Sequence, residues 1–183
     1  MGRRPLVKVG DVIQIPLSDG RRAYCQFVFE DKENGDIIRV FDFFTKESEI
    51  LDLKEIDISK LLFLPVYASI YWAVKDRGWK VIGSLPVDDY KFTGFLYDLP
   101  AFPPNPNGGG RVKSWSLWDG EKYVELGEIL PKEYQKYESV GVNPAGMIVD
   151  RIETGFDSLE YPKKYNRYIT RDELKRKYPS IKI

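Results

Sequence analysis

The N-terminal part of the chain alternates between apolar and polar positions, a pattern that predicts β-strands. Residues 7–17 are rich in β-branched side chains, and the turn residues Ser18-Asp19-Gly20 follow them. A second strand is predicted over residues 22–30 and a third over 36–44, with a turn at 32–35 between them. Short connections between neighbouring strands close at little entropic cost, so we predict an antiparallel meander. Within the second strand, the alternation would place Ala23, Cys25, Phe27 and Phe29 on one face and Tyr24, Gln26, Val28 and Glu30 on the other.

The middle of the chain carries a helix signal and two further strand signals. Apolar residues recur every four positions before Gly78, which predicts a helix over 66–77 with glycine as its C-terminal cap. The β-branched and aromatic side chains of this segment leave a strand as the alternative. Residues 79–83 predict a short buried strand with Trp79 and Gly83 in the core. Asp119-Gly120 between 112–118 and 121–126 predicts a β-hairpin.

Short helices are predicted towards the C-terminus. Residues 132–138 predict one, and Asn143-Pro144 predicts the start of another, which Gly155 would end. Thr170 and Glu173 have the spacing of a capping box, so a last helix is expected to begin there and to stop before Pro179.

Composition excludes several kinds of chemistry. The chain has no histidine, which removes the usual general base, the usual zinc ligand and the usual proton shuttle. Its single cysteine, Cys25, can form neither an intramolecular disulfide nor a cysteine-rich metal site. The alternating pattern around Cys25 predicts a small buried apolar residue, with a reactive thiol as the alternative. We therefore expect no metal, no cofactor and no catalytic residues.

Paired carboxylates and a run of glycines could still suggest enzymatic or nucleotide chemistry. Paired carboxylates can hydrolyse glycosides, but Asp88 and Asp89 are adjacent and would diverge on a strand, while Asp36 and Asp42 have the pattern of ordinary surface acids. The glycine run 108–110 lacks the Gly-Lys-Ser/Thr of a phosphate loop and is followed by strand-like residues, so it predicts a surface loop. The chain is not predicted to be an enzyme.

No segment reaches the roughly 18 consecutive apolar residues that a membrane-spanning helix needs. Arg3 and Arg4 near the N-terminus are not followed by the apolar core of a signal peptide, and Leu6 stands where a myristoylation signal requires serine or threonine. These features predict a cytoplasmic protein without membrane contact.

Charge is balanced overall, with 28 basic and 28 acidic residues, but it is distributed unevenly. Residues 30–57 hold ten acids against four bases, a net charge of −6, and residues 158–183 hold eight bases against three acids, a net charge of +5. One interpretation is two solvated surfaces; the other is an acidic face that attracts a basic partner. Tyr161, Tyr165 and Tyr168 among lysines and arginines are predicted to pack the basic segment onto the sheet while the charged ends stay in water, with nucleic-acid contact as the less favoured alternative.

Several short motifs resemble the immunity protein 26 family of bacterial polymorphic toxin systems. The opening segment, Gly10-Asp11-Val12-Ile13 with Ile15-Pro16-Leu17 and Asp19-Gly20, is similar to the start of that family. Trp79-Lys80-Val81-Ile82-Gly83 with Leu85-Pro86 is similar to its central motif, and Trp115 with Asp119-Gly120 to its later hairpin. The predicted helix from Asn143 to Gly155 also fits, so the resemblance extends over residues 7–157 and leaves the basic segment outside.

The resemblance implies a cytoplasmic antidote that binds a cognate toxin domain and blocks it. We predict an α+β fold with a strongly twisted antiparallel sheet or partly open barrel and a few short peripheral helices, in one domain over 1–183 with residues 158–183 as a basic extension packed on it. The scaffold residues would be Gly10, Asp11, Pro16, Gly20, Trp79, Gly83, Pro86, Trp115, Asp119 and Gly120. A nuclease toxin must hold phosphates in a basic cleft, so the acidic stretch is the predicted partner-binding face, formed by Tyr24, Asp31, Glu33, Glu47 and Glu49. The alternative is a small nucleic-acid- or peptide-binding module without catalysis.

Overall fold

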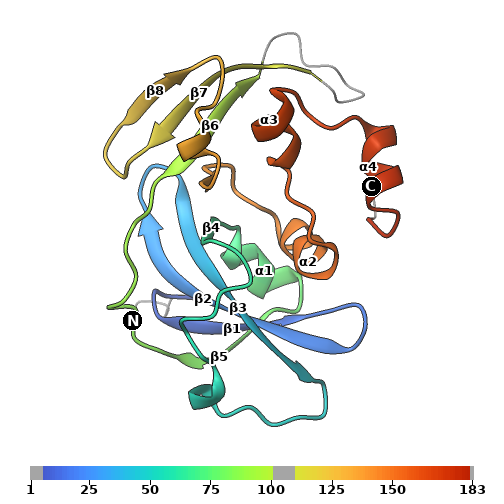
Figure 1. Ribbon diagram of the computed structural model, residues 1–183. Coiled ribbons are helices and arrows are strands. Elements are labelled where there is room, and N and C mark those ends of the chain that lie inside the picture. Colours follow the sequence, from blue (N-terminus) through green and yellow to red (C-terminus); the bar gives the residue numbers. More distant parts are fainter. Residues whose placement is uncertain (1–5, 101–109, 182–183) are drawn as a thin grey trace. The chain divides into compact units, whose positions relative to one another are not determined.

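The computed structural model describes residues 6–100 and 110–181, and Figure 1 traces their helices and strands. The chain divides into two compact units: residues 1–91 with 142–153, and residues 92–141 with 154–183. The predicted single domain over 1–183 stays a prediction. Most of the predicted glycine loop, residues 108 and 109 included, lies outside the described residues, as do Arg3 and Arg4.

The first unit is built on a five-stranded antiparallel sheet with the order β4-β3-β2-β1-β5. The predicted meander is confirmed, because β1, β2 and β3 are consecutive neighbours joined by short turns. The β2–β3 turn places Gly35 at φ +109°, a conformation that glycine adopts without strain. The strands of this sheet are β1 (Asp11–Pro16), β2 (Arg21–Asp31), β3 (Gly35–Lys46), β4 (Val66–Tyr67) and β5 (Lys80–Ser84).

The helices of the first unit are η1 (Leu53–Glu55), α1 (Ile70–Asp76) and α2 (Ala145–Thr154). The prediction of a helix over 66–77 is wrong at its start, because Val66 and Tyr67 pair with β3 as β4 before α1 begins. Its predicted end is correct, since Gly78 has the left-handed φ of +76°. The strand alternative therefore describes the beginning of this segment and the helix describes the rest.

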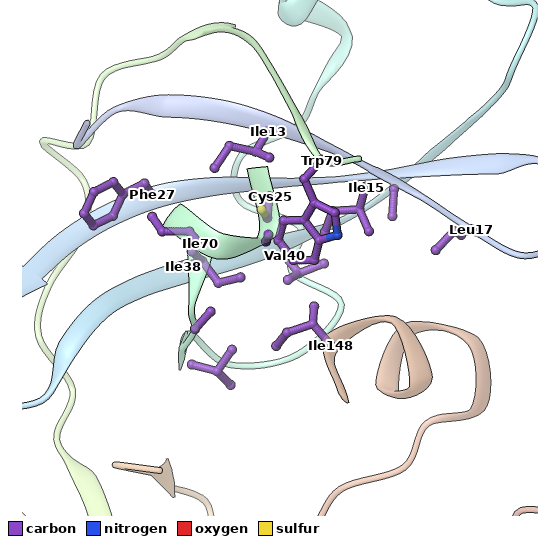
Figure 2. Close-up of a cluster of buried hydrophobic side chains, with 14 residues drawn as sticks. Ile13, Ile15, Leu17, Cys25, Phe27, Ile38, Val40, Ile70, Trp79 and Ile148 are labelled. Atoms are coloured by element: carbon purple, nitrogen blue, oxygen red, sulfur yellow. The ribbon is translucent and has the colours of Figure 1, made fainter. Parts of the chain in front are cut away.

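One hydrophobic core fills the space between the sheet and helices α1 and α2. Figure 2 shows the indole of Trp79 among side chains of β1, β2 and β3, with Ile148 of α2 approaching from the helical side. Trp79 is 3% exposed and Cys25 is fully buried in this core, as predicted for both.

A second core covers the opposite face of the same sheet. Val12, Tyr24, Phe41 and Ile56 are buried there, under partly buried side chains from the segment that runs through η1. Tyr24, Gln26 and Val28 lie on the face opposite Cys25, as the alternation predicts, and this face of β2 is buried as well. Phe29 was placed on the Cys25 face, yet it is 41% exposed, and the β2–β3 register shifts between Phe27 and Phe29.

Strand β5 differs from its prediction. Trp79 is buried, but Val81 and Ile82 are 38% and 36% exposed, because β5 pairs with β1 on one side only and forms an edge of the sheet. Gly83 is half-buried rather than part of the core, although the side chain of Leu53 leaves no room for a Cβ atom there. Only the first residue of the predicted buried strand thus belongs to the core.

The second unit contains a four-stranded sheet with the order β8-β7-β6-β9. The predicted hairpin is confirmed: β7 and β8 pair in antiparallel fashion, and Gly120 in the turn has φ +100°. The predicted helix over 132–138 is wrong, since only the 3-10 turn η2 (Lys132–Tyr134) forms before β9, which pairs parallel to β6. The strands are β6 (Phe95–Pro100), β7 (Val112–Trp118), β8 (Tyr123–Gly127) and β9 (Glu138–Ser139).

Helices α3 (Glu160–Tyr165) and α4 (Arg171–Lys177) belong to this second unit. Tyr168 connects them to the sheet, because its backbone N–H donates to the Gly110 carbonyl at 2.8 Å and its hydroxyl donates to Asp98 Oδ2 at 2.6 Å. The capping box predicted for α4 is present in both directions between Thr170 and Glu173. The structure thus has the predicted α+β class with mostly antiparallel sheets, and neither sheet closes into a barrel within the described residues.

Candidate partner-binding surface

The two scaffold motifs that suggested the family lie side by side in the first unit. Asp11 of the opening motif pairs with Ser84, and Val12 pairs with Gly83 of the central motif. Gly10, at φ +96°, accepts a hydrogen bond from Leu85 N at 2.9 Å on its carbonyl. Two segments far apart in the sequence therefore form adjacent strands. Among the predicted scaffold residues, Gly10, Asp11, Trp79 and Trp115 are buried, Gly83 is half-buried, and Pro16, Gly20, Pro86, Asp119 and Gly120 are exposed.

A buried polar network holds the segment after β5 against the sheet. Gln26 is fully buried and donates to the carbonyls of Leu85 at 2.7 Å and Pro86 at 3.3 Å. Its amide oxygen accepts from the guanidinium of Arg39, which is 4% exposed and forms a salt bridge to Asp89 at 2.5 Å. Hydrogen bonds from Arg39 lower the pKa of Asp89 below its ordinary value of 3.8. Asp89, which the sequence presented as one of two adjacent carboxylates, is thus a structural ion-pair partner.

Two of the five predicted partner-binding residues are buried. Tyr24 is 1% exposed, and its hydroxyl lies 2.6 Å from Thr45 Oγ1. Asp31 is 7% exposed, accepts a hydrogen bond from the Tyr67 hydroxyl, and accepts another from Glu33 N at 2.9 Å within the β2–β3 turn. Both residues have structural partners inside the first unit. Both side chains are covered in this structure, and the partner-binding site itself stays a prediction.

The remaining three residues are exposed but do not form one surface. Glu33 lies in the turn before β3, whereas Glu47 and Glu49 lie directly after it. The strand between them has 12 residues, which at about 3.3 Å per residue is roughly 40 Å when extended. The acidic stretch is therefore split between the two ends of β3.

The loop of residues 46–52 carries two of the three exposed residues of the predicted site. Glu47 is exposed, and Glu49 is exposed while its carboxylate accepts from Lys46 N at 2.9 Å. Asp52 caps η1 by accepting from Lys54 N. Ile50 at the centre of this loop is 97% exposed, whereas the neighbouring Leu51 packs against the second core. The sequence alone does not distinguish these two adjacent apolar residues. The loop presents carboxylates around one uncovered apolar side chain.

Part of the positive charge of the basic C-terminal helices is compensated by acidic side chains. Arg167 is paired with Glu173 at 2.6 Å, and Lys177 is paired with Glu160 at 2.5 Å. Arg167 also lies over the rings of Tyr161 and Tyr165, at 5.4 and 5.9 Å. A hollow of about 280 Å³ is lined by Arg111, Tyr165, Asn166 and Arg167. Of these two cations, Arg111 is exposed and has no acidic partner among the described residues.

Burial raises the pKa of the Cys25 thiol, so this sulfur is not a ready nucleophile. Within the described ranges, no group of three or more cysteine or acidic side chains is placed to hold a metal ion. No helix in the described part of the chain is long and apolar enough to cross a membrane.

Comparison with known proteins finds one family. The family model of Immunity protein 26 matches residues 8–97, so the resemblance predicted from the opening and central motifs is confirmed. The match ends at Tyr97 in β6, so the family assignment of the later hairpin and of the Asn143–Gly155 helix stays a prediction. No curated protein and no solved structure gives a significant match.

Proposed function

We propose that this protein is an antidote that neutralises a cognate bacterial toxin domain by stoichiometric binding, without catalysis, in the cytoplasm of the producing cell. The observation that carries the proposal is the match of residues 8–97 to the immunity protein 26 family. The double-sided core of the first unit supports it, because such a sheet is rigid and can present a surface with little loss of entropy on binding.

The toxin in this proposal is a nuclease, and the loop of residues 46–52 contacts it. A nuclease needs a basic cleft to hold phosphates, and carboxylates that enter this cleft accelerate association and compete with the substrate. Glu47 and Glu49 are exposed at the same end of β3, next to the uncovered Ile50. Glu33 is at the other end of β3 beside the buried Asp31, so we assign it a secondary role.

The test uses the toxin domain encoded beside this protein's gene, in a catalytically inactive form, and measures association at several salt concentrations. Reversing both charges with Glu47→Lys and Glu49→Lys should slow association by about tenfold or more and flatten its dependence on salt. The same change at the other end of β3, Glu30→Lys with Glu33→Lys, should have a smaller effect. An unaltered association rate in the first double variant would contradict the assignment of this loop.

A second candidate function is the binding of an anionic ligand such as single-stranded nucleic acid. The hollow beside Arg111 and Arg167 favours it, whereas the pairing of Arg167 with Glu173 opposes it, since one of the two cations at the hollow is already neutralised. Fluorescence anisotropy with a labelled single-stranded oligonucleotide separates the two functions. Salt-sensitive binding that Arg111→Ala abolishes would favour this candidate over the antidote.

A further inference from the structure

Among the described residues, two aromatic ring pairs have both members exposed. On α1, Tyr71 and Trp72 are 44% and 56% exposed, their rings meet edge to face at 5.3 Å, and Lys75 Nζ lies 4.6 Å from the Trp72 ring. In the second unit, Tyr97 of β6 and Tyr123 of β8 are 42% and 47% exposed, with ring centroids 5.7 Å apart. Tyrosine and tryptophan are the side chains that most often anchor protein interfaces, so each pair is a candidate anchor.

Strand register explains how the second pair forms. Ser116 of β7 pairs with Tyr97 on one side and with Glu125 on the other, so these three side chains share one face of the sheet. Tyr123 pairs with Trp118, two residues further along β7, and belongs to the same face. Because serine is small, the two tyrosine rings can meet above β7. We call the surface of Tyr97, Ser116, Tyr123 and Glu125 the tyrosine face.

The two pairs lie in opposite electrostatic surroundings. Residues 119–128, which form the turn and strand beside the tyrosine face, contain Asp119, Glu121, Glu125 and Glu128 against Lys122, a net charge of −3. Residues 70–80, which form α1 and its end, contain Lys75, Arg77 and Lys80 against Asp76, a net charge of +2. A basic partner is attracted by the first surface and repelled by the second.

We propose that the tyrosine face is the aromatic anchor for the toxin and that its occupant is a basic surface of the toxin domain. This inference rests on the proposed function and deepens it. Charge complementarity to a basic partner selects the tyrosine face over the aromatic pair of α1. Tyrosines and serines on a rigid sheet supply contact area and adaptable hydrogen bonds at low entropic cost. Ser116, Tyr123 and Glu125 also lie beyond the matched family segment, where recognition specific to one partner can reside.

The experiment measures affinity and dissociation rate for the inactive toxin domain encoded beside the gene, using the full chain. Replacing both tyrosines, Tyr97→Ala with Tyr123→Ala, should weaken binding by about 30-fold or more, mostly through faster dissociation. The matched control, Tyr71→Ala with Trp72→Ala, removes an aromatic pair of similar exposure from the cationic surface and should change affinity less than about threefold. Glu125→Lys should instead slow association at low salt.

Folding defects are separated from binding defects by two further measurements. Each variant is compared with the wild type by thermal unfolding, and Tyr97→Phe with Tyr123→Phe keeps both rings and should retain most of the affinity. If the wild type binds tightly and the alanine double variant binds equally well, or if the α1 control loses as much affinity, the tyrosine face is not the anchor. If the folded wild type does not bind the toxin domain at all, the proposed function itself is wrong.

Discussion

Trp79→Ala tests the core of the first unit, and Trp72→Ala provides its internal control. Trp79 is 3% exposed in the core between the sheet and helices α1 and α2 (Figure 2), whereas Trp72 on the outer face of α1 is 56% exposed. A buried tryptophan removes about 200 Å² from water, which at about 25 cal/mol per Å² gives an upper estimate of about 5 kcal/mol. Including the cavity that remains, we expect Trp79→Ala to lower the free energy of unfolding by about 3–5 kcal/mol.

Less than half of the Trp72 side chain is buried, so Trp72→Ala should cost about 1–2 kcal/mol, part of it from the lost contact with Lys75. The assay is urea unfolding followed by far-ultraviolet circular dichroism, because tryptophan fluorescence changes with the substitution itself. Comparable m-values in the two variants are required before their free energies are compared. A difference of less than about 1 kcal/mol between the variants would refute the assignment of Trp79 to the core.

Two predictions concern the polar network beside β5. Arg39→Met leaves the buried Gln26 side-chain oxygen without its donor, so it should lower the free energy of unfolding by about 1–3 kcal/mol, measured by urea titration. An unchanged midpoint would show that water replaces the guanidinium at no cost. Because the pKa of Asp89 is lowered in the folded state, its ion pair stabilises the protein fully above its ordinary pKa of 3.8 and loses this effect as the pH falls through the lowered value. Asp89→Asn should therefore reduce the loss of stability between neutral and strongly acidic pH, measured by urea unfolding across that range, and an identical pH profile would contradict this role.

The sequence predicted those elements that local chemistry determines. Gly35, Gly78 and Gly120 all have positive φ, and each lies at a turn or helix end that its neighbours already indicated. The capping box of Thr170 and Glu173 is likewise a local arrangement of four residues. In these cases the backbone conformation depends on residues within one turn of each other, so the amino-acid sequence alone contains the necessary information.

The sequence could not predict which faces of the sheet are covered. Alternation in β2 separates its side chains into two faces, but it does not indicate that the segment through η1 folds over the second face and buries Tyr24. Gln26 is fully buried as well, because Arg39 and three backbone carbonyls satisfy its side-chain amide. Burial of this kind depends on long-range contacts, and polarity in a strand is a poor guide when a partner can satisfy the polar group.

The same limitation explains why the predicted partner-binding residues do not form one surface in the structure. A count of charges along residues 30–57 treats neighbours in the sequence as neighbours in space, whereas a long strand moves Glu33 away from Glu47 and Glu49. In the tyrosine face, residues that are not neighbours in the sequence become neighbours in space. Tyr97, Ser116 and Tyr123 come together only through the pairing of three strands. Partner binding requires side chains that are adjacent and exposed together. Strand register, which a single sequence specifies weakly, is therefore the information that locates such a surface here.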